Sequence, residues 1–289
     1  LLGDAAARLA TMPVRVVRTA GHLAGAASRV LGAARRREIG GFTLPMTAPR
    51  LPFNHTITPR RAFAFGTVSL SVIKRAGRHE DATVNDVILA LVGGVLRRYL
   101  DERGELPDRS LIAAVPVGLA SEGSGQGGDA SGNHWEVMVG SLATDVEDPA
   151  ERIRAVARSS RAAKTVQTAI GDDLWSDLVD VPPGLVRLLA GGYAGLRLAD
   201  LHPALVNVVV SNVRGAPFPL YYAGAPVRAN YPIGPIADGF GLNITLISYQ
   251  DSVDIGFVSC PDVLEEPWNL VRALDDEAAE LEERYPERA

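Results

Sequence analysis

The sequence is poor in cysteine, and this scarcity limits the kind of protein it can encode. Its 289 residues include one cysteine, Cys260, so no intramolecular disulfide can form and a reducing compartment is favoured. The chain also lacks a run of about 18 apolar residues and a secretory signal pattern, so neither a transmembrane helix nor secretion is predicted. We therefore expect a cytoplasmic protein, and the start at Leu1 predicts a processed or truncated end.

Metal-binding and nucleophilic signatures are missing as well. The histidines stand singly, without a second ligand at metal-binding spacing, so no metal site is expected; they are His22, His55, His79, His134 and His202. The glycine-rich stretch 121–132 lacks the GK[ST] ending of a phosphate-binding loop. Cys260 precedes Pro261 at a strand end and is predicted to be a buried small side chain. The sequence contains no convincing general base, and a net charge of −5 argues against nucleic acid as the main partner.

Apolar residues are abundant, at 47% of the total, which is enough for the large core of a folded protein. Alternation predicts strands at 63–68 and 135–139, a short apolar run predicts a buried strand at 111–117, and several more strands are expected within 205–260. Helical spacing predicts helices from Thr83, from Asp148 to about 168, over 183–199 and from about Asp262. Because strands and helices alternate before several strands follow in succession, we expect an α/β protein with one mixed β-sheet covered by helices.

The helix predicted from Thr83 has the clearest start. Residues 83–86, TVND, form a capping box, in which the Thr83 hydroxyl accepts from the Asp86 amide and the Asp86 carboxylate accepts from the Thr83 amide. A glycine pair at 93–94 allows a close neighbour. Asn85 and Asp86 therefore have a structural role, which we take as primary, while free amides at this terminus also suit negative charge developing in a nearby cleft.

The first 38 residues form a basic arm with seven arginines against Asp4 and Glu38. Two roles are equally compatible with it: an interfacial segment on anionic lipid, and a solvated connector packed on the main lobe. We place the connector arm at 1–49 and the main lobe at 50–289. The bias toward arginine, with Lys74 and Lys164 as the two lysines, is attributed to a GC-rich genome.

The final predicted helix carries a row of acids. We expect them to form a solvated surface, with contact to the basic arm as the second reading. They are Asp275, Asp276, Glu277, Glu280, Glu282 and Glu283.

Polar side chains appear where the strands within 205–260 end. A buried strand leads into Ser211-Asn212, and strand ends commonly line sites. The Tyr231-Pro232-Ile233 stretch is stiff and extended, and Gly239 and Gly241 let the backbone approach a neighbour closely before Asn243. Taken alone, these residues favour core packing with ordinary turns over an apolar substrate channel.

Several of these segments, in this order, resemble the bacterial wax ester synthase/diacylglycerol acyltransferase family. The matching segments are residues 83–90, Gly132-Asn133, residues 211–217 and the block from Tyr231 to Asn243-Ile244, within a resemblance that spans 50–285. It implies the chloramphenicol-acetyltransferase-like fold, in which two similar lobes meet around a tunnel. The chain resembles the carboxy-terminal lobe with its connector.

The resemblance also implies an activity. The family's catalytic motif, HHxxxDG, belongs to the other lobe and is absent here. Its second histidine is the general base that lets a hydroxyl of diacylglycerol or a fatty alcohol attack the acyl-CoA thioester, with acyl-CoA as a substrate and no cofactor. By position, Asn85 and Asp86 match the family's ND motif, and Asn133 joins them as active-site support. No catalytic residue is implied in this chain; the implied substrate-binding residues are Ser211, Asn212, Tyr231, Pro232, Ile233, Gly241 and Asn243.

Two hypotheses follow. The leading one is the carboxy-terminal half of an acyl-CoA-dependent O-acyltransferase that makes triacylglycerol or wax esters. Its partner is an amino-terminal half carrying HHxxxDG, and it associates peripherally with a membrane or lipid inclusion. The alternative is a catalytically inactive lipid-binding or scaffold protein derived from such an enzyme.

Overall fold

A computed structural model describes residues 47–118, 135–170 and 183–287. The basic arm at 1–38, the glycine-rich stretch 121–132 and Asn133 lie outside the described residues. The described strands form a six-stranded sheet in the order β1-β8-β7-β4-β2-β3 and a separate two-stranded hairpin. The six strands are β1 (Ala62–Ser69), β2 (Ile112–Gly118), β3 (Trp135–Ser141), β4 (Val208–Arg214), β7 (Leu242–Tyr249) and β8 (Ser252–Ser259).

The sheet is mixed, as the sequence predicts. Strands β1, β8 and β7 pair antiparallel, β7, β4 and β2 run parallel, and β3 returns antiparallel to β2. Parallel neighbours need a covered crossover connection. The long chain stretch between β2 and β4, which includes a helix, meets this requirement.

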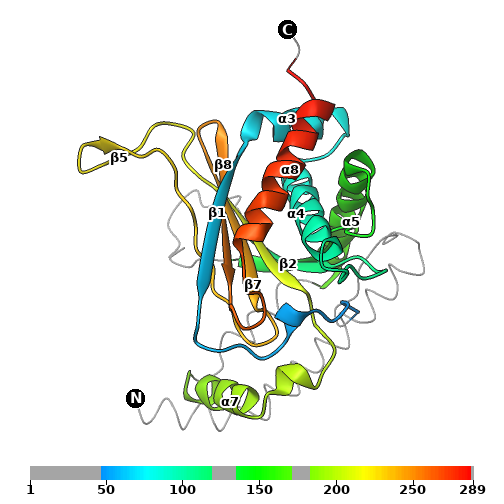
Figure 1. The fold of residues 1–289 in the computed structure, drawn as a ribbon, viewed down its shortest axis with the longest axis vertical. Coiled ribbons are helices and arrows are strands. Elements are labelled where there is room, and N and C mark those ends of the chain that lie inside the picture. Colours follow the sequence, from blue (N-terminus) through cyan, green and yellow to red (C-terminus); the bar gives the residue numbers. More distant parts are fainter. Residues whose placement is uncertain (1–46, 119–134, 171–182, 288–289) are drawn as a thin grey trace.

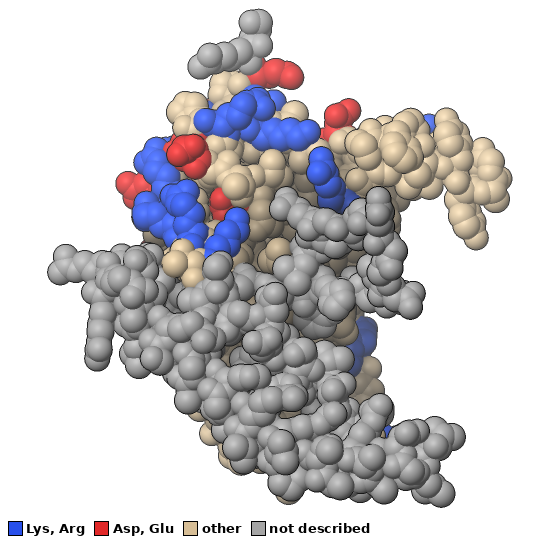
Figure 2. All heavy atoms as spheres, turned by 180° about the vertical axis from the view of Figure 1, so that it is seen from behind, with Lys and Arg blue, Asp and Glu red and all other residues tan. Residues whose placement is uncertain are grey.

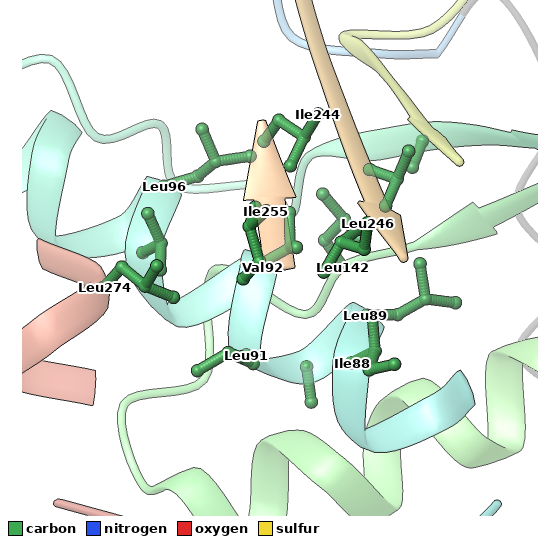
Figure 3. Packing of buried hydrophobic residues seen from close by; sticks show 14 of the residues in the cluster. Ile88, Leu89, Leu91, Val92, Leu96, Leu142, Ile244, Leu246, Ile255 and Leu274 are labelled. Carbon is green, nitrogen blue, oxygen red and sulfur yellow. The ribbon is translucent and has the colours of Figure 1, made fainter. Parts of the chain in front are cut away.

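Helices cover one face of this sheet, and they lie together on one side of it in Figure 1. They are α3 (Leu70–His79), α4 (Val84–Asp101), α5 (Pro149–Ile170) and α8 (Trp268–Arg284). Helix α4 lies at the centre, and its Leu91, Val92 and Leu96 pack with Ile244 and Ile255 of the sheet in one buried cluster (Figure 3). Each fully buried side chain of this kind stabilises the fold by about 1.5–3 kcal/mol relative to exposure.

The start of α4 confirms the predicted capping box. The Thr83 hydroxyl accepts from the Asp86 backbone amide at 3.2 Å, and the Asp86 carboxylate accepts from the Thr83 backbone amide at 3.0 Å. The predicted close approach at the glycine pair is confirmed too. A β-carbon on Gly93 would lie 2.1 Å from the Leu142 carbonyl oxygen, and one on Gly94 would lie 2.1 Å from a carboxylate oxygen of Glu277.

That last contact corrects one prediction about the acidic face of the final helix. Glu277 is not solvated but 2% exposed, because its carboxylate accepts from the buried Arg152 guanidinium at 2.5 Å and from Arg98 at 2.6 Å. Glu280 is half-buried, and the exposed members of the row are Asp275, Asp276, Glu282 and Glu283.

The final helix also begins later than predicted, at Trp268 and not near Asp262. The backbone after Cys260 first makes a tight turn, in which the amides of Val263 and Leu264 donate to the Cys260 carbonyl. The Asp262 carboxylate accepts from Arg60 at 2.7 Å, so it does not cap a helix. Pro267 occupies the cap position just before the first helical residue.

The remaining described elements are short or lie beside the sheet and its helices, and η1 among them contributes the buried Phe53 to the core. Helix α7 (Pro183–Gly195) ends before the predicted residue 199, because Arg197 takes a left-handed conformation before the short 3-10 helix η2 (Leu198–Asp200). A 3-10 helix, η1 (Pro52–Asn54), precedes β1, and the β5–β6 hairpin (Tyr221–Tyr222 and Ala225–Pro226) projects from the body in Figure 1. In the described part of the chain, no helix combines the length and apolar character needed to cross a bilayer.

Candidate active site

Two asparagines from distant parts of the chain meet where α4 begins. Asn85 is the second residue of α4, and its side-chain carbonyl accepts from the Asn212 side-chain amide at 3.1 Å. Along β4, Val208 and Val210 point into the helix-covered core, so the alternation of a strand turns Asn212 toward the same face. The helix cap and the strand pleat together therefore position this pair.

The pair lines a hollow of about 420 Å³. Its walls come from α3, the start of α4, the end of β4 and the turn that follows β7. The described lining residues are Leu70, Lys74, Thr83, Val84, Asn85, Ile88, Asn212, Arg214, Gly215, Ala216, Pro217, Ser248 and Gln250. Glycine is required at 215, because a β-carbon there would lie 2.0 Å from the Ser248 carbonyl oxygen.

The chemistry of this hollow is that of a hydrogen-bond donor site. The side-chain NH₂ of Asn85 has no hydrogen-bond acceptor among the described residues, and the amino-terminal end of α4 adds partial positive charge. Lys74 and Arg214 are the ionisable groups among the described lining residues, so no carboxylate or imidazole borders it there. Such a hollow can polarise a carbonyl or hold an anion, but its described walls supply no general base.

Asp86 has a structural role beside this hollow. It is 5% exposed, and one carboxylate oxygen accepts from both the backbone amide and the hydroxyl of Thr83, at 3.0 and 2.7 Å. These bonds hold the first turn of α4, and with it Asn85, in place.

Tyr231, Pro232 and Ile233 lie on the opposite face of the sheet from the asparagine pair. The Pro232 carbonyl oxygen would be 1.9 Å from a β-carbon on Gly256, so the extended segment crosses β8 there. Tyr231 stacks on Phe65 with ring centroids 4.3 Å apart, and Ile233 is 71% exposed.

Asn243 and Gly241 pack against this same extended stretch and against η1. The Asn243 amide donates to the Pro235 carbonyl at 3.2 Å, and the Gly241 amide donates to the Phe53 carbonyl at 2.7 Å. Ser211 pairs in register with Thr245 and, by strand alternation, faces away from Asn85. Of the residues proposed for substrate binding, the structure thus brings Asn212 to Asn85 and sets the others on the far face.

The histidines in the described ranges are all engaged elsewhere. His55 contacts Asp200 at 3.1 Å, His79 contacts Glu80 at 3.2 Å, and His202 contacts the Tyr193 hydroxyl at 2.5 Å. None of the three lines the asparagine hollow. Within those ranges no three His, Cys, Asp or Glu side chains gather closely enough for a metal ion.

Cys260 is fully buried, as the sequence predicts. Its thiol lies 3.6 Å from the Thr58 hydroxyl and 3.6 Å from an Asp262 carboxylate oxygen.

Sequence reasoning did not identify Lys74, Arg214, Ser248 or Gln250 as site residues. They come from α3, β4, β7 and the turn between β7 and β8, which only the folded chain brings together. One signal was available for Lys74, since it is one of two lysines in the chain.

Comparison with known families gives two matches that together reach most of the chain. Residues 131–282 match the WS/DGAT C-terminal domain, and residues 2–88 match the wax ester synthase/diacylglycerol acyltransferase catalytic domain. The Asn85 segment therefore falls in the second match and Asn212 in the first.

Two Mycobacterium tuberculosis proteins named as diacylglycerol O-acyltransferases are among the curated relatives. One is 38% identical over 239 residues, covering 80% of this chain and 46% of the relative. The other is 36% identical over 265 residues, covering 91% and 57%. The chain thus spans about half the length of the relatives it matches.

Solved structures with a similar fold include a member of the same family. The wax ester synthase/diacylglycerol acyltransferase from Marinobacter aquaeolei VT8 superposes with a TM-score of 0.64 at 28% identity, over 91% of this chain and 56% of that one. A condensation domain of the enacyloxin polyketide synthase superposes with a TM-score of 0.53 at 14% identity, over 90% and 48%, which bears on the fold alone.

Proposed function

The chain belongs to the wax ester synthase/diacylglycerol acyltransferase family, and we propose that it forms one half of an acyl-CoA-dependent O-acyltransferase centre. The acceptor is the hydroxyl of diacylglycerol or of a fatty alcohol, so the product is triacylglycerol or a wax ester. The observation that carries the proposal is the Asn85–Asn212 contact, which leaves the Asn85 NH₂ group free of described partners in the 420 Å³ hollow.

Asn85 would act on the thioester carbonyl. A general base takes the proton of the acceptor hydroxyl, whose oxygen attacks the thioester carbon and forms a tetrahedral oxyanion. The Asn85 NH₂ donates to this oxyanion while Asn212 fixes the orientation of the amide, and the positive end of α4 adds to the stabilisation. The oxyanion then collapses, the C–S bond breaks, and the CoA thiolate leaves and takes up a proton.

The base in this scheme comes from outside the described hollow, whose lining holds no imidazole or carboxylate. We assign it to the second histidine of an HHxxxDG motif on an amino-terminal partner polypeptide. Because both acceptors are lipids, the complex would work in the cytoplasm at a membrane or lipid-inclusion surface, with the basic arm at 1–38 as the segment that associates with it.

The test is acyl transfer by the chain mixed with the amino-terminal half of a family member, which carries HHxxxDG and lacks the carboxy-terminal lobe. Asn85→Ala should lower kcat about 100-fold, the effect of removing one oxyanion donor, with a smaller change in KM. Asn269→Ala is a matched control, since Asn269 is also a half-buried second residue of a helix, α8, and lies outside the hollow.

Two outcomes would contradict the proposal. One is an Asn85→Ala mixture that transfers acyl groups at the unsubstituted rate. The other is a mixture that binds acyl-CoA and lipid but forms no ester. The second outcome would instead support an inactive lipid-binding or scaffold protein.

A further inference from the structure

Three surface hollows meet at one lysine. Lys74 lines the 420 Å³ hollow of Asn85, a second of about 600 Å³ and a third of about 830 Å³. The first and second hollows also share Thr83 and Val84, and the second and third share Arg78. A continuous depression therefore runs from the asparagine pair along α3.

The middle hollow is strongly basic. Its cations are Lys74 and Arg78 of α3 and Arg161 and Lys164 of α5, a set that we name the basic furrow. Figure 2, the view from behind, shows Lys and Arg side chains gathered on the upper part of the molecule with some Asp and Glu among them. The whole chain has a net charge of −5, so this cluster of positive charge contrasts with the acidic character of the chain. Both lysines of the sequence lie in the furrow.

Three of the furrow's cations are available to a ligand. Lys74, Arg78 and Arg161 are exposed, and none has an ion-pair or hydrogen-bond partner on its side chain within the described ranges. The acids that line the same hollow are Asp81 and Asp86. Asp86 accepts from Thr83 in the capping box but keeps its charge, so among the described lining residues four cations face two carboxylates.

The end of α4 adds to the attraction for anions. Thr83 and Val84 line the furrow, so the positive end of the α4 dipole faces the same space as the four cations. Phosphate groups are the ligands that suit such a combination of ammonium, guanidinium and helix terminus.

We propose that the basic furrow binds the phosphate groups of the CoA donor. Its adenosine 3′-phosphate and diphosphate lie on Lys74, Arg78 and Arg161, and its pantetheine arm enters the adjoining hollow and presents the thioester to Asn85. This assignment rests on the proposed acyl-transfer function for the reacting end, while the phosphate contacts can be measured by binding alone.

The test is calorimetric binding of CoA, dephospho-CoA and pantetheine to the 289-residue chain. CoA should bind tightest, and the double substitution Arg78→Ala with Arg161→Ala, at two residues that line the furrow and are not among the described lining residues of the asparagine hollow, should raise its Kd at least about tenfold while pantetheine binding stays unchanged. Lys74→Arg, which keeps the charge, should retain most of the CoA affinity. Arg272→Ala removes an exposed arginine from α8, outside the furrow, and serves as the matched control.

An unchanged Kd for CoA in the double variant would overturn the proposal. So would unchanged CoA binding together with lost flotation on phosphatidylglycerol vesicles, because the furrow would then serve a lipid surface. Acyl-transfer assays distinguish failure of the CoA-binding proposal from failure of the proposed acyl-transfer function. If CoA affinity depends on the furrow but no ester forms, the proposal of CoA binding stands and the proposal of acyl transfer is wrong.

Discussion

At the scale of single residues, the most consequential feature of the core is a buried ion pair. The Arg152 guanidinium, 1% exposed, donates to Glu277 at 2.5 Å and to the carbonyls of Ala90, Val146 and Glu147 at 3.0–3.2 Å. Burial lowers the pKa of Arg152 below its ordinary value, and the charge of Glu277 counteracts that change. The buried charges are therefore compatible with a stable fold only while both partners are present.

Removing the negative partner should be costly. We predict that Glu277→Gln lowers the free energy of unfolding by about 3–5 kcal/mol, because the Arg152 charge stays buried without its counter-ion. Urea denaturation of the 289-residue chain measures the effect. Glu282→Gln on the exposed side of the same helix is the control and should change stability by less than about 0.5 kcal/mol. Equal stabilities for the two variants would contradict this account of the pair.

The residue scale also shows where sequence reasoning reaches its limit. The capping box could be predicted because both partners lie within four residues, and their local chemistry defines the geometry. Glu277 and Arg152 are 125 residues apart, and Asn85 and Asn212 are 127 apart. Periodicity describes one element at a time, so it could not show that one acid in a mostly exposed row turns inward to a distant arginine.

At the scale of elements, the first turn of α4 connects stability with the site. The capping box fixes the helix start, and the helix start carries Asn85 to the end of β4. The predicted capping bonds are present, and they hold the side-chain amide of Asn85 in position.

Loss of the cap should weaken the fold modestly. We predict that Thr83→Ala lowers the free energy of unfolding by about 1 kcal/mol, because one amide of α4 loses its acceptor and Asp86 loses a donor. Thr83→Ser keeps the hydroxyl and should recover most of the loss. Chemical denaturation of both variants checks this, and a serine variant as unstable as the alanine variant would show that the hydroxyl bonds are unimportant.

The basic arm belongs to the same scale. Its seven arginines within 38 residues lead us to predict that deleting residues 1–38 weakens flotation of the chain on vesicles containing phosphatidylglycerol. Neutral phosphatidylcholine vesicles are the control, on which the deletion should have a small effect. Unchanged flotation on the anionic vesicles would contradict the lipid-binding role of the arm and favour a solvated connector.

At the scale of the whole molecule, several carboxylates stabilise the fold in their charged form. The backbone amide of Thr56, with Arg197 and His55, holds the pKa of Asp200 below its usual range. Burial acts to raise the pKa of Glu80, but its hydrogen-bond donors, Tyr285 foremost, outweigh that and lower it. Each such group stabilises the fold above its unfolded pKa and loses that contribution as the pH falls through its folded pKa.

The urea midpoint should therefore fall as the pH drops from about 5 to about 2, since the unfolded chain takes up protons before these carboxylates do. The variant Asp200→Asn should be less stable at neutral pH and should show a shallower dependence. Denaturation curves at a series of pH values measure both effects. A midpoint that stays constant across the acid range would be inconsistent with the lowered pKa values.

The fold class of the whole chain could be predicted, because strand alternation and the ordered motifs both lead to a mixed sheet covered by helices. The strand order could not be predicted from periodicity, since β4 inserts between β2 and β7, which are far apart in the sequence. For the same reason, the predicted site residues do not all lie together in the structure. Asn212 reached Asn85, whereas Tyr231 to Asn243 lies across the sheet from them.

The most direct test of the central claim is ester formation from labelled acyl-CoA and diacylglycerol or a fatty alcohol. The chain is mixed with the amino-terminal half of a family member, which carries HHxxxDG and lacks the carboxy-terminal lobe, and each component is also assayed alone. We expect labelled triacylglycerol or wax ester from the mixture, none from either component alone, and loss of product when the second histidine of the motif is replaced by alanine. Product formed by the 289-residue chain alone, or no product from a mixture that forms a complex and binds acyl-CoA, would contradict it.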